Sequence, residues 1–166
     1  MEIPVHADGV LIWQGRRMRC ALGRGGVAAA KCEGDSATPT GVLPLRRLLY
    51  RPDRMAPPET RLPTAALAKD DGWCDDPRDP LYNQAVKLPF GGRHEELWRA
   101  DALYDVIVVL GHNDDPPHPN LGSAIFMHIA AADYGPTEGC VALALEDLFD
   151  VVAGCGTEAR LRVSPD

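Results

Sequence analysis

The sequence predicts a single, mainly β domain with one or two helices and long loops. The 166 residues are enough for one domain with a sizeable core. Sixteen glycines and fifteen prolines, spread along the chain, divide it into short segments, which favours strands and turns over a helical bundle. The β-branched run Val106–Leu110 is typical of a buried strand. We find no repeat, low-complexity segment or linker, so residues 1–166 are expected to form one domain.

Short strands are expected in the first third of the chain. Gly9–Gly15 and Arg16–Gly23 indicate a hairpin that turns near Gln14, and Gly26–Asp35 contains a further short strand. A longer strand is expected in residues 41–53, after the turn sequence SATPTG. Residues 51–92 have weak periodicity and many Pro, Asp and Arg residues, which indicates long ordered loops with one short helix at most. A loop of this length inside a compact domain is usually functional or a lid.

The second half has stronger patterns. His94–Asp101 is interpreted as a helical turn, Leu103–Asn113 as the central strand and Ser123–Ile129 as a second buried strand. The apolar spacing within Leu143–Gly154, the acidic residues of its first turn and its final glycine predict a helix. Residues 158–165 alternate apolar and polar side chains and predict a last strand.

Composition excludes several classes of function. The net charge of −7 argues against a nucleic-acid partner, because phosphate binding needs clustered Lys and Arg, and the basic clusters at residues 16–19 and 46–47 are short. No apolar stretch approaches the ~18 residues needed to cross a bilayer, so stable membrane insertion is not expected. The first residues do not resemble a signal peptide. The protein is therefore expected either to stay in the cytoplasm or to be a mature form whose leader has been removed.

The five cysteines cannot all pair within the chain, and none forms a C-x-x-C motif. Cys140 differs from the others because it follows a glycine and lies twelve positions after His128, which ends an apolar run. A thiol nucleophile at neutral pH needs a nearby base and backbone N–H donors for an oxyanion. Gly139 would allow an unusual backbone angle and close substrate approach. The alternative is a buried core strand that happens to contain both residues.

The residues around this pair resemble the catalytic domain of L,D-transpeptidases, the YkuD-like family. The family shows a histidine that ends a strand, then a loop and Ser/Thr-His-Gly-Cys; here Met127-His128 and the sequence TEGCVA at 137–142 are similar. The segment KCEGDSATPTGVLPL at 31–45 resembles a second family hallmark. The resemblance covers roughly residues 9–154 and implies a β-sandwich of mixed sheets. It also implies that Cys140 is the nucleophile, that His128 is its base, and that Gly139 and Cys140 offer N–H groups to the oxyanion.

This sequence departs from the family pattern at Glu138, where a histidine is usual, and at Ala142, where Arg or Asn is usual. A divergent branch of the family carries TEGC, and the segment DGWCDDPRDPLYN at 71–83 resembles that branch. The residues that usually shape the acyl-donor or acyl-acceptor pocket in the family therefore differ in this sequence. Further candidates for substrate binding are Thr137, Glu138, Tyr134, His112 and Asn113. The group that orients His128 is expected to be a backbone carbonyl, as is common in the family, or Asp133 or Glu138.

The resemblance implies a function in the cell wall. The expected reaction is attack of Cys140 on a peptidoglycan stem peptide and transfer of the acyl group to a diaminopimelate amine, giving 3,3 or, as in the divergent branch, 1,3 cross-links. Hydrolysis of stem peptides and a non-catalytic wall-binding module are alternatives. The resemblance also implies work in the periplasm or cell envelope, no cofactor, and covalent inhibition by carbapenems. A metalloenzyme that uses His112, Asp114, Asp115, His118 and His128 is a rival, but their spacing matches no short zinc pattern.

Overall fold

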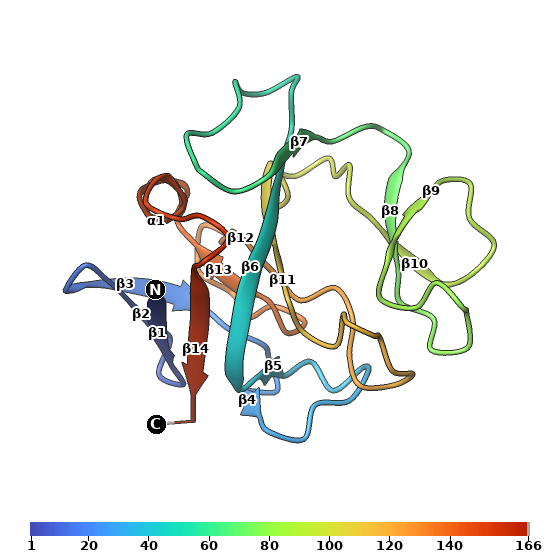
Figure 1. Cartoon of the computed structure of the whole chain (residues 1–166), viewed down its shortest axis with the longest axis horizontal. Coiled ribbons are helices and arrows are strands. Elements are labelled where there is room, and N and C mark those ends of the chain that lie inside the picture. The colour runs from blue at the N-terminus through green and yellow to red at the C-terminus, as the bar shows by residue number, and fades with distance from the viewer. Residues whose placement is uncertain (166) are drawn as a thin grey trace.

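The computed structural model describes residues 1–165 and is built mainly of strands (Figure 1). The strands are β1 (Glu2–His6), β2 (Val10–Trp13), β3 (Arg16–Ala21), β4 (Val27–Ala28), β5 (Thr38–Pro39), β6 (Gly41–Tyr50), β7 (Thr64–Ala66), β8 (Asp71–Cys74), β9 (Ala85–Lys87), β10 (His94–Glu96), β11 (Val106–Leu110), β12 (Phe126–Ile129), β13 (Val141–Leu143) and β14 (Arg160–Ser164), and the helix among the described residues is α1 (Leu145–Ala153). The prediction of a mainly β fold with mixed sheets is confirmed.

The largest sheet folds back on itself. Its strand order is β11-β12-β13-β3-β2-β1-β14-β6-β7, and β6 also pairs with β11. The ten-residue strand β6, in the centre of Figure 1, makes this closure possible: its first half pairs with β14 and its second half with β11. Parallel pairs (β1 with β14, β12 with β13) occur beside antiparallel ones. The main core lies inside this closed sheet.

The predicted hairpin is present as β2 and β3. Its two-residue turn has positive φ at Gln14 (49°) and Gly15 (80°), the type I′ geometry whose twist matches paired antiparallel strands. Alternate residues of β3 are buried, with Met18 and Cys20 directed into the core. The predicted central strand, second buried strand, helix and last strand are also confirmed, as β11, β12, α1 and β14.

Strand β11 is buried on both faces, which explains its unbroken apolar sequence. Val106 and Val108 belong to the main core, whereas Ile107 and Val109 belong to a second core on the other face. This second core consists of Leu67, Trp73, Leu97, Tyr104, Ile107, Val109, Ala124, Phe126 and Cys140. The sheet formed by β11, β12 and β13 therefore separates the two cores.

Residues 64–96 cover this second core with strands and no helix. β8, β9 and β10 form a small sheet of their own, on the right of Figure 1. The Trp73 ring of β8 packs edge-on against Phe126, with 5.1 Å between ring centroids. The interpretation of His94–Asp101 as a helical turn is wrong, because residues 94–96 pair antiparallel with β8. Pairing with a distant strand outweighs the local pattern here.

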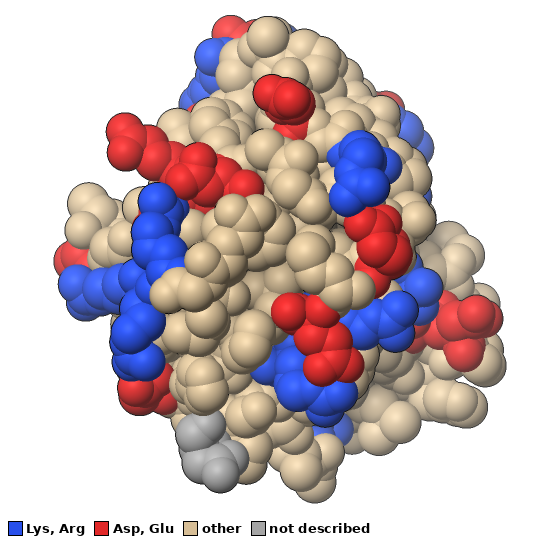
Figure 2. All heavy atoms as spheres, turned by 60° about the vertical axis from the view of Figure 1, so that its left-hand side comes forward, with Lys and Arg blue, Asp and Glu red and all other residues tan. Residues whose placement is uncertain are grey.

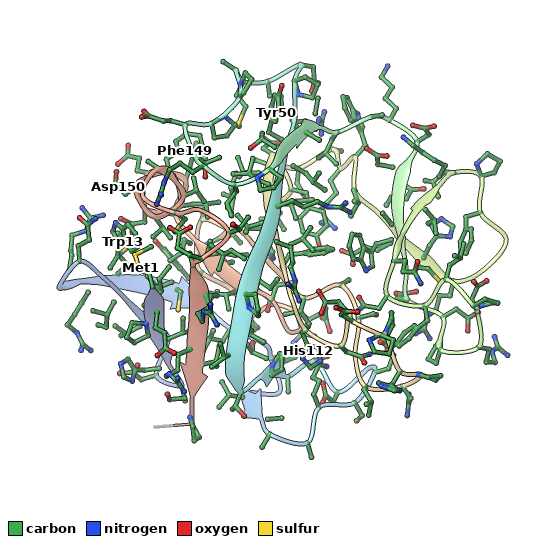
Figure 3. All side chains as sticks on the ribbon, in the orientation of Figure 1. Met1, Trp13, Tyr50, His112, Phe149 and Asp150 are labelled. Carbon is green, nitrogen blue, oxygen red and sulfur yellow. The ribbon has the colours of Figure 1, made fainter. Side chains whose placement is uncertain are left out.

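Helix α1 packs its buried face, Leu148, Val151 and Val152, into the main core. As predicted, Gly154 follows its last residue; a side chain there would clash with Trp13, since a Cβ atom would lie 2.5 Å from the indole ring. Trp13 lies beside this helix in Figure 3. The helix is too short to span a membrane, and no helix among residues 1–165 is long and apolar enough to do so.

The surface carries both signs of charge. On the face that Figure 2 shows, basic side chains gather along one edge, while acidic and basic groups lie side by side elsewhere. Many form exposed ion pairs, such as Arg162 with Glu2 at 2.7 Å and Arg16 with Asp150 at 2.8 Å. Exposed pairs of this kind contribute little to stability, about 0–1 kcal/mol each.

Candidate active site

His128 lies on β12 and points into the second core. The strand alternates its faces, so Met127 and Ile129 enter the main core while Phe126 and His128 point the other way. The Nδ1 atom of His128 bonds to the carbonyl oxygen of Ile129 at 2.8 Å. Because a carbonyl only accepts hydrogen bonds, Nδ1 carries the proton, and Nε2 is left with a lone pair.

The imidazole is held in a nearly dry environment. It is 6% exposed, and the ring of Tyr104 packs edge-on against it with 5.2 Å between centroids. Burial lowers the pKa of His128 to about 4, although the bond to the Ile129 carbonyl acts in the opposite direction. At neutral pH the ring is therefore uncharged and available as a base.

Cys140 immediately precedes β13, which runs parallel to β12 and places Ala142 opposite His128. The thiol is 6% exposed; it donates to the Ala124 carbonyl at 3.3 Å and accepts from the Phe126 N–H at 3.4 Å. Burial and then the negative charge of Glu95 raise the pKa of Cys140 to about 12. The resting group is a neutral thiol, so the two residues do not rest as an ion pair.

Both side chains line one cavity of about 440 Å³. No hydrogen bond joins them within residues 1–165; each is held by a backbone group. The Ala124 residue that holds the thiol has a left-handed backbone (φ 53°), and the Asn83 side chain fixes it by accepting its N–H at 3.0 Å. The neutral thiol of Cys140 and the unprotonated Nε2 of His128 therefore line the same cavity.

The turn before Cys140 is organised by Thr137. Its hydroxyl donates to the Cys140 carbonyl at 2.7 Å and accepts the Gly139 N–H at 3.1 Å. Its backbone bonds to the chain at Leu22 and Arg24. Thr137 also lines the cavity, but its hydroxyl is committed to the turn.

Gly139 has a backbone conformation that only glycine adopts readily, with φ at +130°. A Cβ atom there would lie 2.8 Å from the Ala37 carbonyl oxygen and 3.3 Å from Ile125. The sequence suggests its N–H as an oxyanion donor, and in the structure Thr137 Oγ1 accepts that N–H. The N–H of Cys140 forms no hydrogen bond among the described residues and is the free donor next to the sulfur.

Neither Glu138 nor Asp133 orients His128. Glu138 lines the cavity but bonds to Arg24 at 2.9 Å and to the Ser36 hydroxyl at 2.5 Å, which together lower its pKa, Ser36 most strongly. Asp133 accepts the N–H of Gly135 at 2.9 Å within its own loop. The Ile129 carbonyl performs the orienting role that the sequence suggests for these carboxylates.

Residues 5–160 match the YkuD family, described as the L,D-transpeptidase catalytic domain. The chain belongs to this family. A crystal structure described as that of the helical cell shape determining protein Pgp2 from Campylobacter jejuni is similar to this YkuD domain over 99% of its length, with 15% sequence identity and a TM-score of 0.41. The chain spans 47% of that protein's length. None of the curated proteins compared matches it.

Three residues expected to bind substrate in this YkuD domain lie outside the cavity lining. Tyr134 packs under the guanidinium of Arg19, 4.3 Å from the ring centroid. His112, which Figure 3 labels, bonds to the Leu121 carbonyl at 2.9 Å. Asn113 bonds to both the N–H and the carbonyl of His118. His112 and Asn113 shape the loop before β12 instead of facing the site.

The geometry does not support the alternative hypothesis of a metalloenzyme. Its candidates are dispersed: Asp114 pairs with Arg46, while His112 and His128 bond to separate backbone carbonyls. Within residues 1–165, no three His, Cys, Asp or Glu side chains gather closely enough to hold a metal ion. All five cysteines are free thiols, and Cys32 is exposed whereas the other four are buried.

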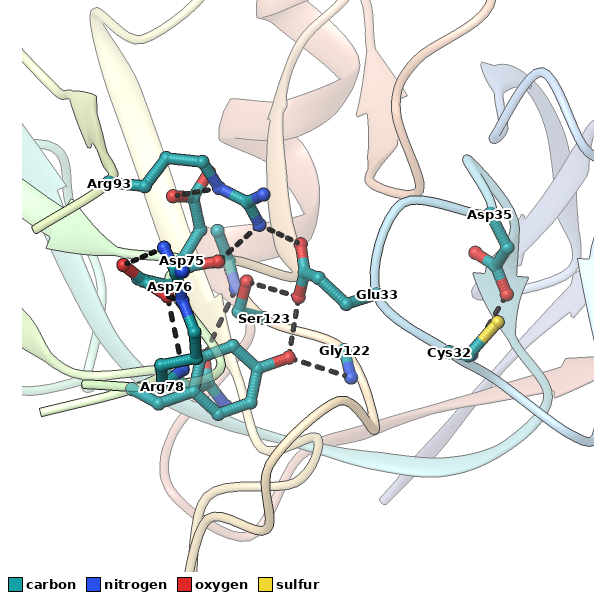
Figure 4. Close-up of polar contacts among 12 residues, drawn as sticks. Cys32, Glu33, Asp35, Asp75, Asp76, Arg78, Arg93, Gly122 and Ser123 are labelled. Atoms are coloured by element: carbon teal, nitrogen blue, oxygen red, sulfur yellow. Dashed lines mark hydrogen bonds and ion pairs between the residues drawn. The ribbon is translucent and has the colours of Figure 1, made fainter. Parts of the chain in front are cut away.

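Several cavity residues are not among the site candidates that the sequence suggests. Glu33, Asp75, Glu95 and Arg99 line it together with Tyr104. Figure 4 shows the polar network at one wall: Glu33 accepts from Ser123 at 2.8 Å and approaches Arg93, which also bonds to Asp75 at 3.1 Å. This network ties the segment after β4 to the small sheet and to the loop before β12. Glu33 and Asp75 lie in segments that resemble the family, whereas Glu95, Arg99 and Tyr104 are identified as site residues by their position in space.

Proposed function

We propose that the protein is a cysteine-dependent L,D-transpeptidase that acts on peptidoglycan stem peptides. The observation that carries the proposal is the pairing of Cys140 and His128 in one cavity of a chain that belongs to the L,D-transpeptidase family. Because peptidoglycan lies outside the cytoplasmic membrane, the protein would work in the periplasm or cell envelope.

In the first half-reaction, the thiol leaves the Ala124 carbonyl and passes its proton to Nε2 of His128 as the sulfur attacks a stem-peptide carbonyl. The neutral resting pair supports proton transfer during attack instead of a preformed thiolate. The tetrahedral oxyanion would accept the free N–H of Cys140. Collapse breaks the C–N bond, the leaving amine takes the proton from His128, and a thioester to Cys140 remains.

In the second half-reaction, an amine of another stem attacks the thioester. The C–N bond forms, the C–S bond breaks, and His128 takes up a proton from the attacking nitrogen and returns it to the sulfur. The diaminopimelate side-chain amine is the proposed acceptor. Ala142, opposite His128, leaves the donor side roomier than an Arg or Asn would, which supports either 3,3 or 1,3 cross-links. Carbapenems are proposed to acylate the same sulfur.

The test is mass spectrometry of muropeptides after incubation with wild-type protein, with Cys140→Ala and with Cys32→Ala. Cys32 is an exposed free thiol outside the cavity and serves as the matched control. We expect cross-linked products from wild-type and Cys32→Ala protein, and none from Cys140→Ala. The masses also identify the bond cleaved: trimmed monomers without dimers would indicate hydrolysis. Muropeptides left unchanged by the wild-type protein, under conditions where a known transpeptidase is active, would support a binding module and contradict the proposal.

A further inference from the structure

Glu95 has a position that the two half-reactions above leave unexplained. It lies on β10, opposite Trp73 of β8, and its carboxylate lines the cavity that contains Cys140. One oxygen, Oε1, accepts the hydroxyl of Tyr104. The other oxygen has no hydrogen-bond partner among residues 1–165, and it is not fully buried, since no fully buried side-chain polar atom in this part of the chain lacks a partner.

The other cavity carboxylates are already neutralised. Asp75 pairs with Arg93 at 3.1 Å and Glu138 with Arg24 at 2.9 Å. Glu33 accepts two hydroxyl groups and lies 3.7 Å from Arg93. Among the carboxylates that line the cavity, Glu95 is the one without an ion pair in the described chain. A carboxylate placed in this way fits a cationic group supplied by a ligand.

Contacts connect Glu95 to the reacting atoms. Tyr104, which donates to Glu95, packs its ring against both His128 (5.2 Å) and Phe126 (5.9 Å). The Phe126 N–H in turn donates to the Cys140 sulfur. Of the charged groups near Cys140, Glu95 acts most strongly on the thiol and raises its pKa. Glu95 and Cys140 therefore line the same cavity and are connected through Tyr104 and Phe126.

Resting on the proposed function, we propose that Glu95 binds the primary ammonium group of the acyl acceptor and takes its proton before attack on the Cys140 thioester. An ammonium has no lone pair and cannot attack. Transfer of one N–H proton to the carboxylate gives a neutral amine beside the thioester and a neutral carboxylic acid. The amine forms the C–N bond, the sulfur leaves with the C–S electrons, and the second nitrogen proton passes through His128 to the sulfur. Glu95 then releases its proton to solvent.

The environment of Glu95 suits this role. Burial raises the pKa of Glu95, and the negative charges of Asp75 and Glu33 add to the rise, while the Tyr104 hydrogen bond and the Arg99 charge act in the opposite direction. The net effect is a raised pKa, so the carboxylate is a stronger base than an exposed one. Tyr104 acts as a positioning residue, because its hydroxyl holds Glu95 while its ring packs against His128. The cavity thus contains two bases: His128 accepts the proton of the thiol, and Glu95 accepts the proton of the ammonium group.

The experiment compares two acceptors with tetrapeptide muropeptides as donor. Methylamine is cationic at neutral pH and needs a base, whereas hydroxylamine is neutral and does not. In Glu95→Gln, which keeps the size of the side chain, we expect the methylamine concentration for half-maximal transfer to rise about tenfold or more, the effect of losing a charge-assisted hydrogen bond. Hydroxylamine transfer and acylation of Cys140 should not fall, because loss of the Glu95 charge removes an influence that raises the thiol pKa; retained acylation also shows that the variant is folded. Glu95→Asp should restore part of the methylamine transfer.

Glu96→Gln is the matched control, since Glu96 is the exposed neighbour on the same strand and does not line this cavity. It should leave both acceptors unchanged. Equal losses with both amines in Glu95→Gln, or no loss with either, would overturn the role of Glu95 while leaving the transpeptidase proposal intact. Wild-type protein that neither consumes muropeptides nor becomes acylated would overturn the proposed function and this inference together.

Discussion

Gly139→Ala is the substitution whose effect follows most directly from the geometry of the active-site turn. Gly139 has φ at +130°, a region that residues with a Cβ atom rarely enter. The added Cβ would also lie 2.8 Å from the Ala37 carbonyl oxygen, which is backbone and cannot rotate away. The turn that carries Cys140 must therefore move.

The magnitude combines two effects. Backbone strain of this kind costs about 1–3 kcal/mol, and relief of the contact with Ala37 adds to it, so we expect a loss of about 2–3 kcal/mol in unfolding free energy. For a chain of this size that corresponds to a melting temperature lower by roughly 5–10 °C. A displacement of Cys140 by about 1 Å can reduce the rate about 10²-fold, and we expect a loss of that order in acylation.

Thermal unfolding followed by circular dichroism, and acylation followed by intact mass, measure the two effects. Gly15→Ala is the matched control: its φ is +80°, but no atom lies within 4 Å of the added Cβ. It should lose about 1–2 kcal/mol from strain alone and keep full acylation activity. Gly91→Ala, with an open site and no left-handed backbone, should change neither. If Gly139→Ala melts and reacts like wild-type protein, the left-handed turn does not hold Cys140 in place as we infer.

Three further predictions concern the same turn and its base. The pKa of His128 is about 4 in the folded protein and 6.5 in the unfolded chain, so the unfolded chain binds more protons between these pH values. The free energy of unfolding should therefore fall by about 3 kcal/mol as the pH drops from 7 to 4. In urea titrations, His128→Gln should flatten this part of the pH profile. Because the Cys140 thiol is neutral and buried, it should react with iodoacetamide at pH 7 more slowly than the exposed Cys32, and its rate should rise steeply with pH. Peptide mass spectrometry measures the labelling of each cysteine. Faster labelling of Cys140 than of Cys32 would show that its thiolate is preformed and contradict this prediction. Thr137→Val keeps the shape but removes the hydroxyl that bonds to Cys140 and Gly139; it should lower stability by about 1–3 kcal/mol and acylation about tenfold, and an unchanged rate in a single-turnover assay would refute its positioning role.

Elements with a strong local pattern could be predicted from the sequence. The run Val106–Leu110 is apolar at every position because β11 is buried on both faces. The hairpin turn at Gln14 and Gly15 and the helix from Leu145 to Ala153 also have signals within a few residues. In contrast, residues 94–96 form a strand only because β8 lies beside them, a long-range pairing that no local window contains.

Some residues of the active site could likewise be predicted from the sequence, and others could not. The prediction that Cys140 and His128 act together depends on the resemblance of TEGC and Met127-His128 to the family pattern, and the parallel pairing of β12 with β13 explains why both side chains line one cavity. Glu95 and Tyr104 could not be predicted as site residues, since the local pattern indicates a helical turn around Glu95 and both side chains reach the cavity only through the tertiary fold. His112 and Asn113 follow a central strand, a common place for functional residues, but their side chains are used by the loop itself.

The central claim is that the Cys140 sulfur carries the acyl group. Rapid quenching of the protein with tetrapeptide muropeptides, followed by digestion and peptide mass spectrometry, tests it directly. We predict a stem-peptide adduct on the peptide that contains Cys140, formed by wild-type protein and strongly reduced in His128→Gln. An adduct on another residue, or product formation that persists in Cys140→Ala, would contradict the account.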